Sequence, residues 1–227
     1  MTRHAAILFD LGNTLAAYYR KEEFNPVLQR CVAAASRELT RMGLPAPTPE
    51  IAFAAALQQN REAADHRFLP LSPRLQRIFG VDVVTADMLC NAFMQPIFAT
   101  ASLYDDSLAV LSALKQRGVK TAIVSNSPWG SSPALWRNEM QRLGLAPLVD
   151  AVVLCGDVGW RKPAPQIFKH AAAQLDVDCA RCSFVGDDVQ WDIEGSAAVG
   201  MQPVLLDRMG LHPDHMGTRI TGLHQLL

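Results

Sequence analysis

Chemically reactive side chains follow several apolar segments of the chain, each close to the last apolar residue. Asp10 follows the apolar run 5–9, Ser125 follows the run 121–124, and Lys162 lies on a predicted loop before a helix. A carboxylate can attack an electrophile, a hydroxyl group can bind an anionic oxygen, and an ammonium group can neutralise negative charge. These three residues are therefore candidate site residues.

An acidic cluster follows the apolar segment 183–185. Asp187, Asp188 and Asp192 lie within six residues. Three carboxylates at one strand end repel one another unless they are solvated or bound to a cation, and oxygen-rich sites of this kind suit Mg²⁺. A helix N-cap would account for one of these acids but not comfortably for all three. The cluster therefore predicts a metal site.

Each segment taken alone also has a simpler structural explanation. Asp10 and the polar residues after it are typical of a turn or helix cap. Ser125 and Asn126 are typical of a turn after a strand, and Lys162 of an exposed loop lysine. The chemical interpretation therefore depends on the elements that bring these segments together.

Continuous apolar runs alternate with helical patterns in the second half of the chain. Runs of this kind predict buried strands of a parallel sheet, at 5–9, 121–124, 151–154, 183–185 and 203–206. Helices are predicted between the later runs, at 105–117, 133–143, 165–175 and 190–199. The alternation predicts a doubly wound α/β sheet, with residues 207–217 forming a loop before a last short strand and helix.

The stretch 16–100 breaks this alternation because it contains no convincing strand. Helical patterns are predicted at 24–42, 49–65, 73–79 and 84–98. We expect an α/β core formed by residues 1–15 and 101–227, with 16–100 as an all-helical insert. The insert is expected to lie over the carboxyl ends of the strands, where open α/β sheets bind ligands.

A parallel sheet of this kind brings the ends of its strands together, so that Asp10, Ser125, Lys162 and Asp187 would share one crevice. An acidic nucleophile, a hydroxyl anchor, a cation and a metal-binding acid are the parts needed for phosphoryl transfer. The combined pattern therefore predicts chemistry on a phosphate ester.

The chain resembles the haloacid dehalogenase superfamily over its whole length. The four hallmarks of that family are matched in order by Asp10-Leu11-Gly12-Asn13-Thr14, Ser125-Asn126, Lys162-Pro163 with Pro165, and Gly186-Asp187 with Asp192. The resemblance implies a Rossmann-like core, and the insert is similar to the helical cap of one large branch. It also implies an Mg²⁺-dependent hydrolase, with a small phosphorylated metabolite as the expected substrate.

The resemblance further implies a role for each matched residue. Asp10 is expected to form an aspartyl-phosphate, and Thr14 to support the loop around it. The residues expected at the phosphoryl group are Ser125, Asn126, Lys162 and Gly12. The metal is expected to be held by Asp10, Asp187 and the backbone carbonyl of Gly12, with Asp192 ahead of Asp188 completing its surroundings.

Gly12 departs from the family pattern, because phosphatases of the family usually carry a second Asp at this position. That Asp protonates the leaving oxygen and then activates water, a role typically worth about 10²–10⁴-fold in rate. We expect slow turnover, a substrate with a good leaving group, or a replacement, for which Asp188 and His66 are the candidates.

The same departure leaves other chemistries open. Haloacid dehalogenases of the family also lack the second Asp, but they do not carry an acid cluster like that at 187–192. Phosphonoacetaldehyde hydrolases need a lysine in the insert, where Lys21 is present beside Glu22 and Glu23. A phosphate-binding or regulatory relative without efficient catalysis is the remaining alternative.

The composition and charge of the chain argue against some classes of protein. The 227 residues are 49% hydrophobic and 19% charged, with a formal net charge of −1, so no overall basic footprint predicts nucleic-acid binding. No apolar run is long enough to span a membrane, and the N-terminus lacks a signal-peptide pattern, so a cytoplasmic protein is expected. Cys179-x-x-Cys182 has redox or metal spacing but no second pair. The insert is expected to select the substrate, with Arg20 its best candidate contact.

Overall fold

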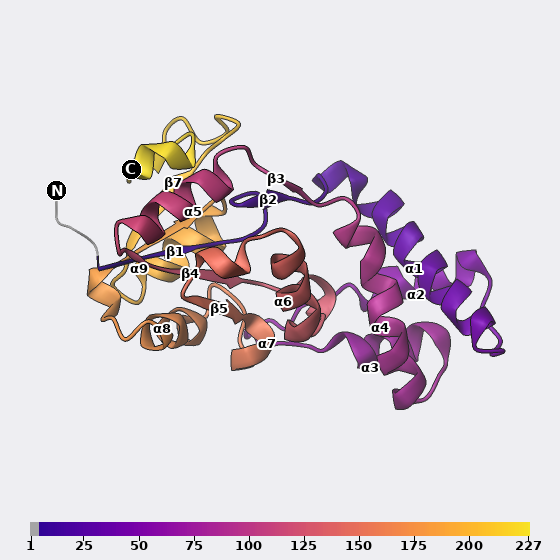
Figure 1. The fold of residues 1–227 in the computed structure, drawn as a ribbon. Helices are drawn as coiled ribbons and strands as arrows, with labels where there is room; N and C mark the ends of the chain where they lie inside the picture. Colours follow the sequence, from indigo (N-terminus) through magenta and orange to yellow (C-terminus); the bar gives the residue numbers. More distant parts are fainter. Residues whose placement is uncertain (1–4) are drawn as a thin grey trace.

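The fold is built on a single parallel sheet, seen in a computed structural model that describes residues 5–227, without the side chain of Lys21. Six strands form this sheet in the order β5-β4-β1-β6-β7-β8 (Figure 1). They are β1 (Ala6–Phe9), β4 (Lys120–Ser125), β5 (Ala151–Leu154), β6 (Cys182–Gly186), β7 (Gln202–Leu206) and β8 (Arg219–Ile220). The first five coincide with the predicted apolar runs, and β8 is the expected last short strand. The predicted α/β fold class is confirmed.

Helices cover both faces of this sheet. The core helices are α5 (Ser107–Gln116), α6 (Pro133–Arg142), α7 (Cys155–Val158), α8 (Pro165–Gln174), α9 (Gly195–Ala197) and the π-helix η5 (Val189–Glu194). Short 3-10 segments are η2 (Pro128–Gly130), η3 (Ala146–Leu148), η4 (Cys179–Arg181) and η6 (Leu223–Leu226). Figure 1 shows α5 and α8 on opposite sides of the sheet. The expected helix at 190–199 is therefore divided between η5 and α9.

The strands have two buried faces because alternate residues point to opposite sides. Ile7 and Phe9 of β1 belong to the apolar cluster that contains the inner face of α5. Leu8 belongs to a second cluster, where Phe168 of α8 packs edge-to-face on Phe184 with ring centres 5.0 Å apart. Burial on both faces explains why these strands are continuously apolar in sequence.

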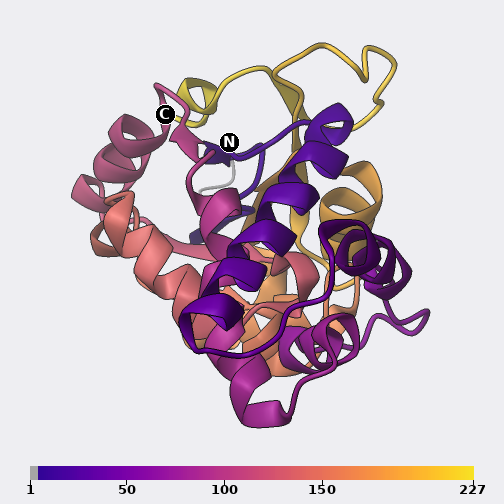
Figure 2. The same ribbon diagram turned by 90° about the vertical axis from the view of Figure 1, so that its right-hand side faces the viewer.

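Four helices lie between the first strand and the rest of the sheet and form the helical insert. They are α1 (Phe24–Arg41), α2 (Pro49–Gln59), α3 (Leu71–Phe79) and α4 (Val83–Phe98), with a 3-10 turn η1 (Lys21–Glu23) before them. Two have side-chain N-caps: Thr48 accepts a hydrogen bond from the backbone of Ile51, and Asp82 accepts one from Thr85. Figure 2 shows the helices side by side, with α1 packed along α4.

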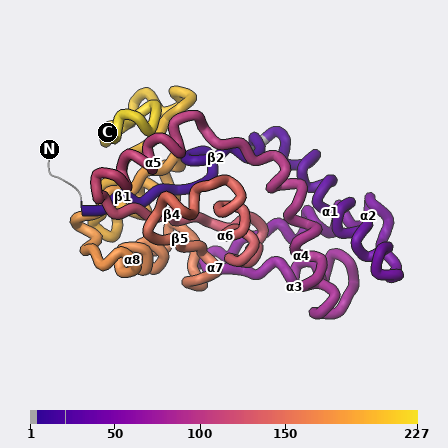
Figure 3. The backbone as a smooth tube through the Cα atoms, viewed as in Figure 1, coloured from indigo at the N-terminus to yellow at the C-terminus, as the bar shows by residue number. Residues whose placement is uncertain are grey.

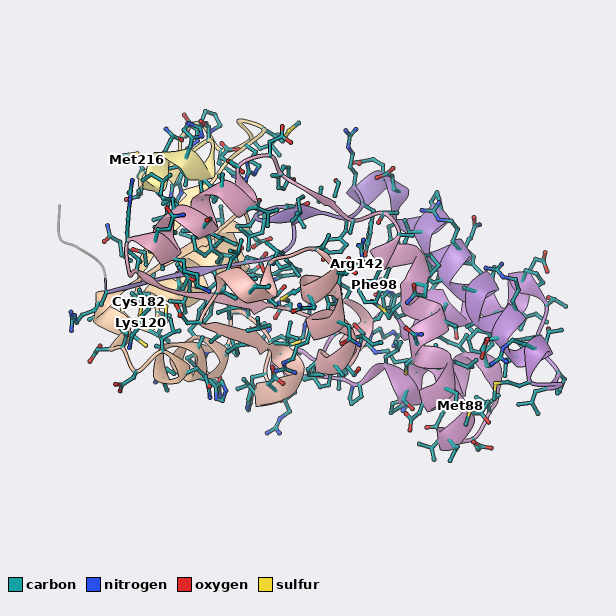
Figure 4. The ribbon with its side chains drawn as sticks, viewed as in Figure 1. Met88, Phe98, Lys120, Arg142, Cys182 and Met216 are labelled. Carbon is teal, nitrogen blue, oxygen red and sulfur yellow. The ribbon has the colours of Figure 1, made fainter. Side chains whose placement is uncertain are left out.

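The insert lies beyond the carboxyl ends of the strands. Figure 4 shows Lys120 and Cys182, which begin β4 and β6, at the end of the sheet away from the insert, and Met88 at the lower edge of the insert. Phe98 and Arg142 lie at the junction, where the Arg142 guanidinium donates a hydrogen bond of 3.3 Å to the Phe98 carbonyl oxygen. The strand ends therefore face the insert.

Two short strands join the insert to the core and correct one prediction. β2 (Ala16–Ala17) pairs antiparallel with β3 (Ser102–Leu103), so the stretch 16–100 does contain strand residues. Two residues are too few to show a periodic pattern in the sequence. The helix predicted at 49–65 was also too long, because α2 ends at Gln59, whose carbonyl oxygen accepts a hydrogen bond from Arg74.

The Cys179-x-x-Cys182 motif lies far from the strand ends that face the insert. Both thiols are free, and burial raises the pKa of Cys182 to about 11. A protonated, buried thiol is a poor nucleophile and metal ligand. Among the helices formed by residues 5–227, none has the length and apolar character needed to cross a lipid bilayer.

Candidate active site

Asp10 lies at the carboxyl end of β1 on a tight loop. Its backbone N–H donates a 2.9 Å hydrogen bond to the Val185 carbonyl oxygen of β6, and its side chain reaches a cavity at the strand ends. Asn13 takes a left-handed conformation, with φ of 54°, which Asn adopts more readily than most residues. The turn lets the chain leave the sheet directly after Asp10, so the carboxylate stays at the mouth of the strand.

Lys162 is buried between two carboxylates. Its ammonium Nζ lies 2.6 Å from Asp10 Oδ1 and 2.6 Å from Asp192 Oδ1, and the residue is only 3% exposed. Burial by itself lowers the pKa of a lysine, but here Asp10 and Asp192 outweigh it and raise the Lys162 pKa above its ordinary value. Lys162 is therefore a permanent positive charge beside Asp10.

Asn126 fixes the backbone of Lys162. Its side-chain Oδ1 accepts a 2.8 Å hydrogen bond from the Lys162 N–H, and its Nδ2 donates one of 3.2 Å to the Lys162 carbonyl oxygen. The neighbouring Ser125 ends β4 and lines the same cavity as Asp10. The amide of Asn126 is thus engaged by protein, while Ser125 is placed to contact a ligand.

Three carboxylates meet beside Lys162. One oxygen from each of Asp10, Asp187 and Asp192 lies within 4.8 Å of the other two. Burial raises the pKa of Asp187 to about 7, and the charges of Asp10 and Asp192 add to this effect. A raised pKa of this origin means that the carboxylates lack sufficient positive charge nearby.

Asp192 differs from the other two acids because both of its oxygens are engaged. Oδ1 accepts a hydrogen bond from Lys162, and Oδ2 accepts one of 3.1 Å from the backbone N–H of Asp188. The carboxyl group packs directly on Gly186, where any Cβ would lie 2.2 Å from Oδ2. This close approach explains the need for glycine before Asp187. Asp192 is 1% exposed and lies behind the cavity rather than in its wall.

One further acid and one hydroxyl group lie beside this cluster. Asp188 lines the cavity and caps η5, because its Oδ1 accepts a 2.7 Å hydrogen bond from the Trp191 N–H. Thr14 is fully buried, and its hydroxyl lies 3.5 Å from Asp187 Oδ1, which makes at best a weak hydrogen bond. Thr14 therefore contacts the acid cluster at Asp187 but does not line the cavity.

The cavity at the strand ends has a volume of about 290 Å³. The residues predicted from sequence that line it are Asp10, Gly12, Ser125, Asn126, Lys162, Asp187 and Asp188. Tyr18, Tyr19 and Trp191 also line it, with Ile97 contributed by α4 of the insert. The sequence offered no signal for these aromatic residues, which are placed by the linker after β2 and by η5.

A second cavity of about 470 Å³ adjoins the first and shares Asn13, Tyr18, Tyr19 and Asp187 with it. Arg20 lines this second cavity rather than the first, together with Arg208 and His212 from the loop after β7. Figure 2 shows this loop, drawn in yellow, near the start of α1. His66, one sequence candidate for acid–base chemistry, lines neither of these two cavities in the described part of the chain.

Comparisons with known proteins agree with this fold. A family model described as haloacid dehalogenase-like hydrolase matches residues 4–200. Ribulose-1,5-bisphosphate 5-phosphatase of Halopiger xanaduensis is 32% identical over 213 residues, which cover 89% of this chain and 84% of that protein. The chain belongs to the haloacid dehalogenase-like hydrolase family, and it is a hydrolase.

Solved structures of both a phosphatase and a dehalogenase have the same fold as this chain. A HAD phosphatase from Thermococcus onnurineus superposes with a TM-score of 0.70 at 24% identity, covering 97% of this chain and 95% of that one. A 2-haloacid dehalogenase from Pseudomonas syringae pv. Tomato DC3000 gives 0.69 at 21% identity, with the same coverage of 97% and 95%. At these identities the likeness defines the fold, and the reaction must be argued from the site.

Proposed function

We propose that the protein is an Mg²⁺-dependent phosphatase that hydrolyses a small phosphorylated metabolite through an aspartyl-phosphate on Asp10. The observation that carries the proposal is the grouping of Asp10, Asp187 and Lys162 around one cavity at the strand ends. A phosphate ester and its attacking carboxylate are both negative, so the site must supply positive charge. Lys162 supplies one part of it.

The residues present fit a magnesium ion. Asp187 has a raised pKa because burial and two neighbouring carboxylates disfavour its charged form, and a divalent cation would relieve this repulsion. We assign the ion to Asp10, Asp187 and the Gly12 carbonyl oxygen, which accepts no hydrogen bond from residues 5–227. Mg²⁺ bound there would neutralise phosphate oxygens and polarise the phosphorus. Asp192 contributes charge but is already engaged by Lys162 and Asp188.

The reaction divides into two displacements. A carboxylate oxygen of Asp10 attacks phosphorus, the bond from phosphorus to the ester oxygen breaks, and the ester oxygen leaves with a proton as the alcohol. Water then attacks the phosphorus of the aspartyl-phosphate, releasing inorganic phosphate and restoring the Asp10 carboxylate. Ser125 and Lys162 hold the phosphoryl oxygens during both steps, because they border the same cavity as Asp10.

The site lacks the usual side chain for proton transfer to the leaving group. Gly12 has no side chain to protonate the leaving oxygen, and the first cavity contains one acid besides Asp10 and Asp187, namely Asp188. We assign the proton-transfer role to Asp188, whose Oδ1 is partly engaged by Trp191. Turnover is expected to be slow and to favour substrates whose leaving group needs little protonation.

The insert and its linker are proposed to select the substrate. The first cavity adjoins the second one and shares four lining residues with it, so the part of a substrate beyond its phosphoryl group would extend toward Arg20. The similarity to a phosphatase of ribulose-1,5-bisphosphate supports a phosphorylated sugar or a related small metabolite as the substrate. A soluble cytoplasmic enzyme acting on such a metabolite, without a nucleic-acid or membrane partner, is the setting we propose.

Phosphate release from p-nitrophenyl phosphate and a panel of sugar and acid phosphates tests the proposal. We expect activity in Mg²⁺, none in EDTA, and none for Asp10→Asn, which keeps the shape of the side chain but removes the nucleophile. Rapid quenching should trap acid-stable phosphate on the wild-type chain only. Release of halide from 2-chloropropionate in EDTA, without any phosphate release, would instead identify dehalogenase chemistry. Absence of both activities would favour a phosphate-binding role.

A further inference from the structure

The segment between α2 and α3 is fastened to the loop that carries Lys162. The Phe68 N–H donates a 2.9 Å hydrogen bond to the Gly159 carbonyl oxygen, and the Arg161 N–H donates one of 2.8 Å to the His66 carbonyl oxygen. Arg67 and Trp160 face each other in this antiparallel bridge. Figure 3 shows the segment passing from the insert back to the core beside α7. The insert therefore touches the core away from its two linkers.

Side chains reinforce this backbone bridge. Glu62 of the insert lies 2.7 Å from the Arg161 guanidinium, in an ion pair whose arginine side chain is 13% exposed and whose glutamate is 38% exposed. The guanidinium of Arg67 lies 4.8 Å from the centre of the Trp160 ring. Arg74 of α3 also reaches Glu62, at 3.5 Å, and so holds the glutamate from the side of the insert.

Arg161 connects this contact to the site. It is the residue before Lys162, and its guanidinium lies 5.7 Å from the centre of the Trp191 ring, which lines the cavity beside Asp10. Lys162 itself is held by Asn126, which hydrogen-bonds to its backbone N–H and carbonyl oxygen. The lysine loop is thus held by the insert at residue 161 and by the core at residue 162.

We propose that Glu62 is a positioning residue for catalysis, acting through Arg161 on the loop that carries Lys162. This inference rests on the proposed function, in which Lys162 neutralises the phosphoryl group. A lysine between two carboxylates needs a fixed backbone, since a shift of about 1 Å at a reacting group can cost up to about 10²-fold in rate. The helical insert would then be part of the catalytic apparatus as well as a cover over it.

A double-mutant cycle tests the proposal. Glu62→Gln removes the negative charge at constant size, and Arg161→Gln removes the positive charge and leaves a shorter polar side chain. We expect each to lower kcat on p-nitrophenyl phosphate about tenfold, with KM changed less than about twofold. The double variant should be no slower than either single variant, because the two residues act as one unit.

Glu38→Gln is the matched control, because Glu38 forms an ion pair with Arg41 at 2.6 Å on the exposed side of α1. It should leave kcat and KM unchanged. A merely structural role for Glu62 would lower Tm while kcat of the folded fraction stayed at the wild-type value. That result, or additive losses in the double variant, would overturn the proposal.

Hydrogen exchange separates this inference from the proposed function, because it needs no turnover. In Glu62→Gln, amides of the peptide covering residues 159–164 should exchange faster than in wild type, whereas Glu38→Gln should leave them unchanged. Faster exchange in Glu62→Gln, together with a wild-type protein that lacks phosphatase activity, would support the coupling of Glu62 to the Lys162 loop and reject the proposed reaction. Unchanged exchange in an active enzyme would reject the coupling alone.

Discussion

The ammonium group of Lys162 is surrounded by more negative charge than it can balance. Asp10, Asp187 and Asp192 carry three negative charges when ionised, and Lys162 carries one positive charge, which leaves two negative charges uncompensated. Removing ions from water costs several kcal/mol each unless partners compensate them. The site therefore has the charge and the oxygen ligands for one divalent cation.

Binding of Mg²⁺ should depend on pH through Asp187. Its ordinary pKa is 3.8 and its folded pKa is about 7, so between these values the metal-free folded state holds a proton that the unfolded state has lost. Stability of the metal-free protein therefore falls as pH rises through this range. Mg²⁺ must displace the proton, so its affinity should weaken roughly tenfold for each pH unit below 7.

Thermal unfolding with and without MgCl₂ measures this effect. The rise in Tm caused by Mg²⁺ should be clearly larger at pH 8 than at pH 6. Asp187→Asn should lose the Mg²⁺-dependent rise at both pH values. Its metal-free Tm should depend on pH less than that of wild type but not become independent of it, because burial still raises the pKa of Asp192. An equal rise for wild type at pH 6 and pH 8 would contradict the assignment of Asp187 as a ligand.

Gly12 can be converted into the missing acid. A Cβ at this position meets no atom within 4 Å, and the residue does not require a left-handed conformation. Gly12→Asp should therefore fold normally and raise kcat on alkyl phosphates by about 10- to 100-fold, because it restores proton transfer to the leaving oxygen. The gain should be much smaller on p-nitrophenyl phosphate, whose leaving group needs little protonation.

Gly12→Asn is the control for this experiment, since it has the same size but cannot transfer a proton. Steady-state assays of the three proteins on glycerol phosphate and p-nitrophenyl phosphate give the comparison. Equal rates for the Asp and Asn variants would mean that Asp188 or another group already supplies the proton efficiently.

The η2 segment, which lies between β4 and α6, packs very closely against the insert. Gly130 has a φ of +68°, and a Cβ on it would lie 1.7 Å from the carbonyl oxygen of Leu69 in the insert. Trp129 beside it is also left-handed, with φ of 61°, and packs edge-to-face on Phe93 of α4 at 5.3 Å. These contacts place η2 directly against both the α2–α3 segment and α4.

Gly130→Ala should be much more destabilising than a matched glycine substitution. Gly118 has nearly the same φ, +70°, but a Cβ there meets nothing within 4 Å. Gly118→Ala should cost about 1–2 kcal/mol from left-handed strain alone. Gly130→Ala adds an overlap with backbone and should cost more than about 3 kcal/mol. Urea unfolding of both variants measures the difference, and equal losses would mean that Leu69 moves away freely.

The sequence was sufficient to locate the strands and helices that have a strong hydrophobic pattern. The apolar runs that form β1, β4, β5, β6 and β7 are buried on both faces. Asp10, Ser125 and Asp187 could be placed at the strand ends because they follow three of these runs closely in the sequence. Three of the four insert helices were located within a few residues for the same reason. The family hallmarks then gave the site residues their expected roles.

The remaining features depend on contacts between distant residues. The segment 60–65 is helix-compatible in sequence, but Arg74 and the bridge to Gly159 draw it toward the core instead. The pairing of β2 with β3, and the ion pair of Glu62 with Arg161, join residues far apart in the chain. Neither has a local pattern, so sequence reasoning from one chain could not find them.

The insert and the core share one apolar cluster. It includes Phe93 of α4, Leu111 of α5, and Trp129 and Trp136 near the junction. Phe98 of the insert packs edge-to-face on Trp136 at 5.1 Å. A hydrophobic interface that is continuous with a core favours cooperative folding of both parts.

We therefore expect insert and core to unfold in one transition. Tryptophan fluorescence, which reports on the junction through Trp129 and Trp136, and circular dichroism at 222 nm, which reports on all helices, should give the same urea midpoint. Trp136→Phe should lower that midpoint without splitting the transition. Two midpoints, with helix content lost in separate steps, would show that the insert unfolds on its own.

The position of β1 has a consequence for how the chain folds as it is made. β1 lies between β4 and β6 in the sheet, yet the entire helical insert separates it in sequence from β4. A strand that leaves the ribosome first must wait, unpaired, for partners that are synthesised much later, and closing so long a loop is slow. Pairing of β2 with β3 shortens this loop, because it brings the two ends of the insert together beside β1. The strand that carries Asp10 is thereby held near the site of its future partners once residues 102–103 have been synthesised.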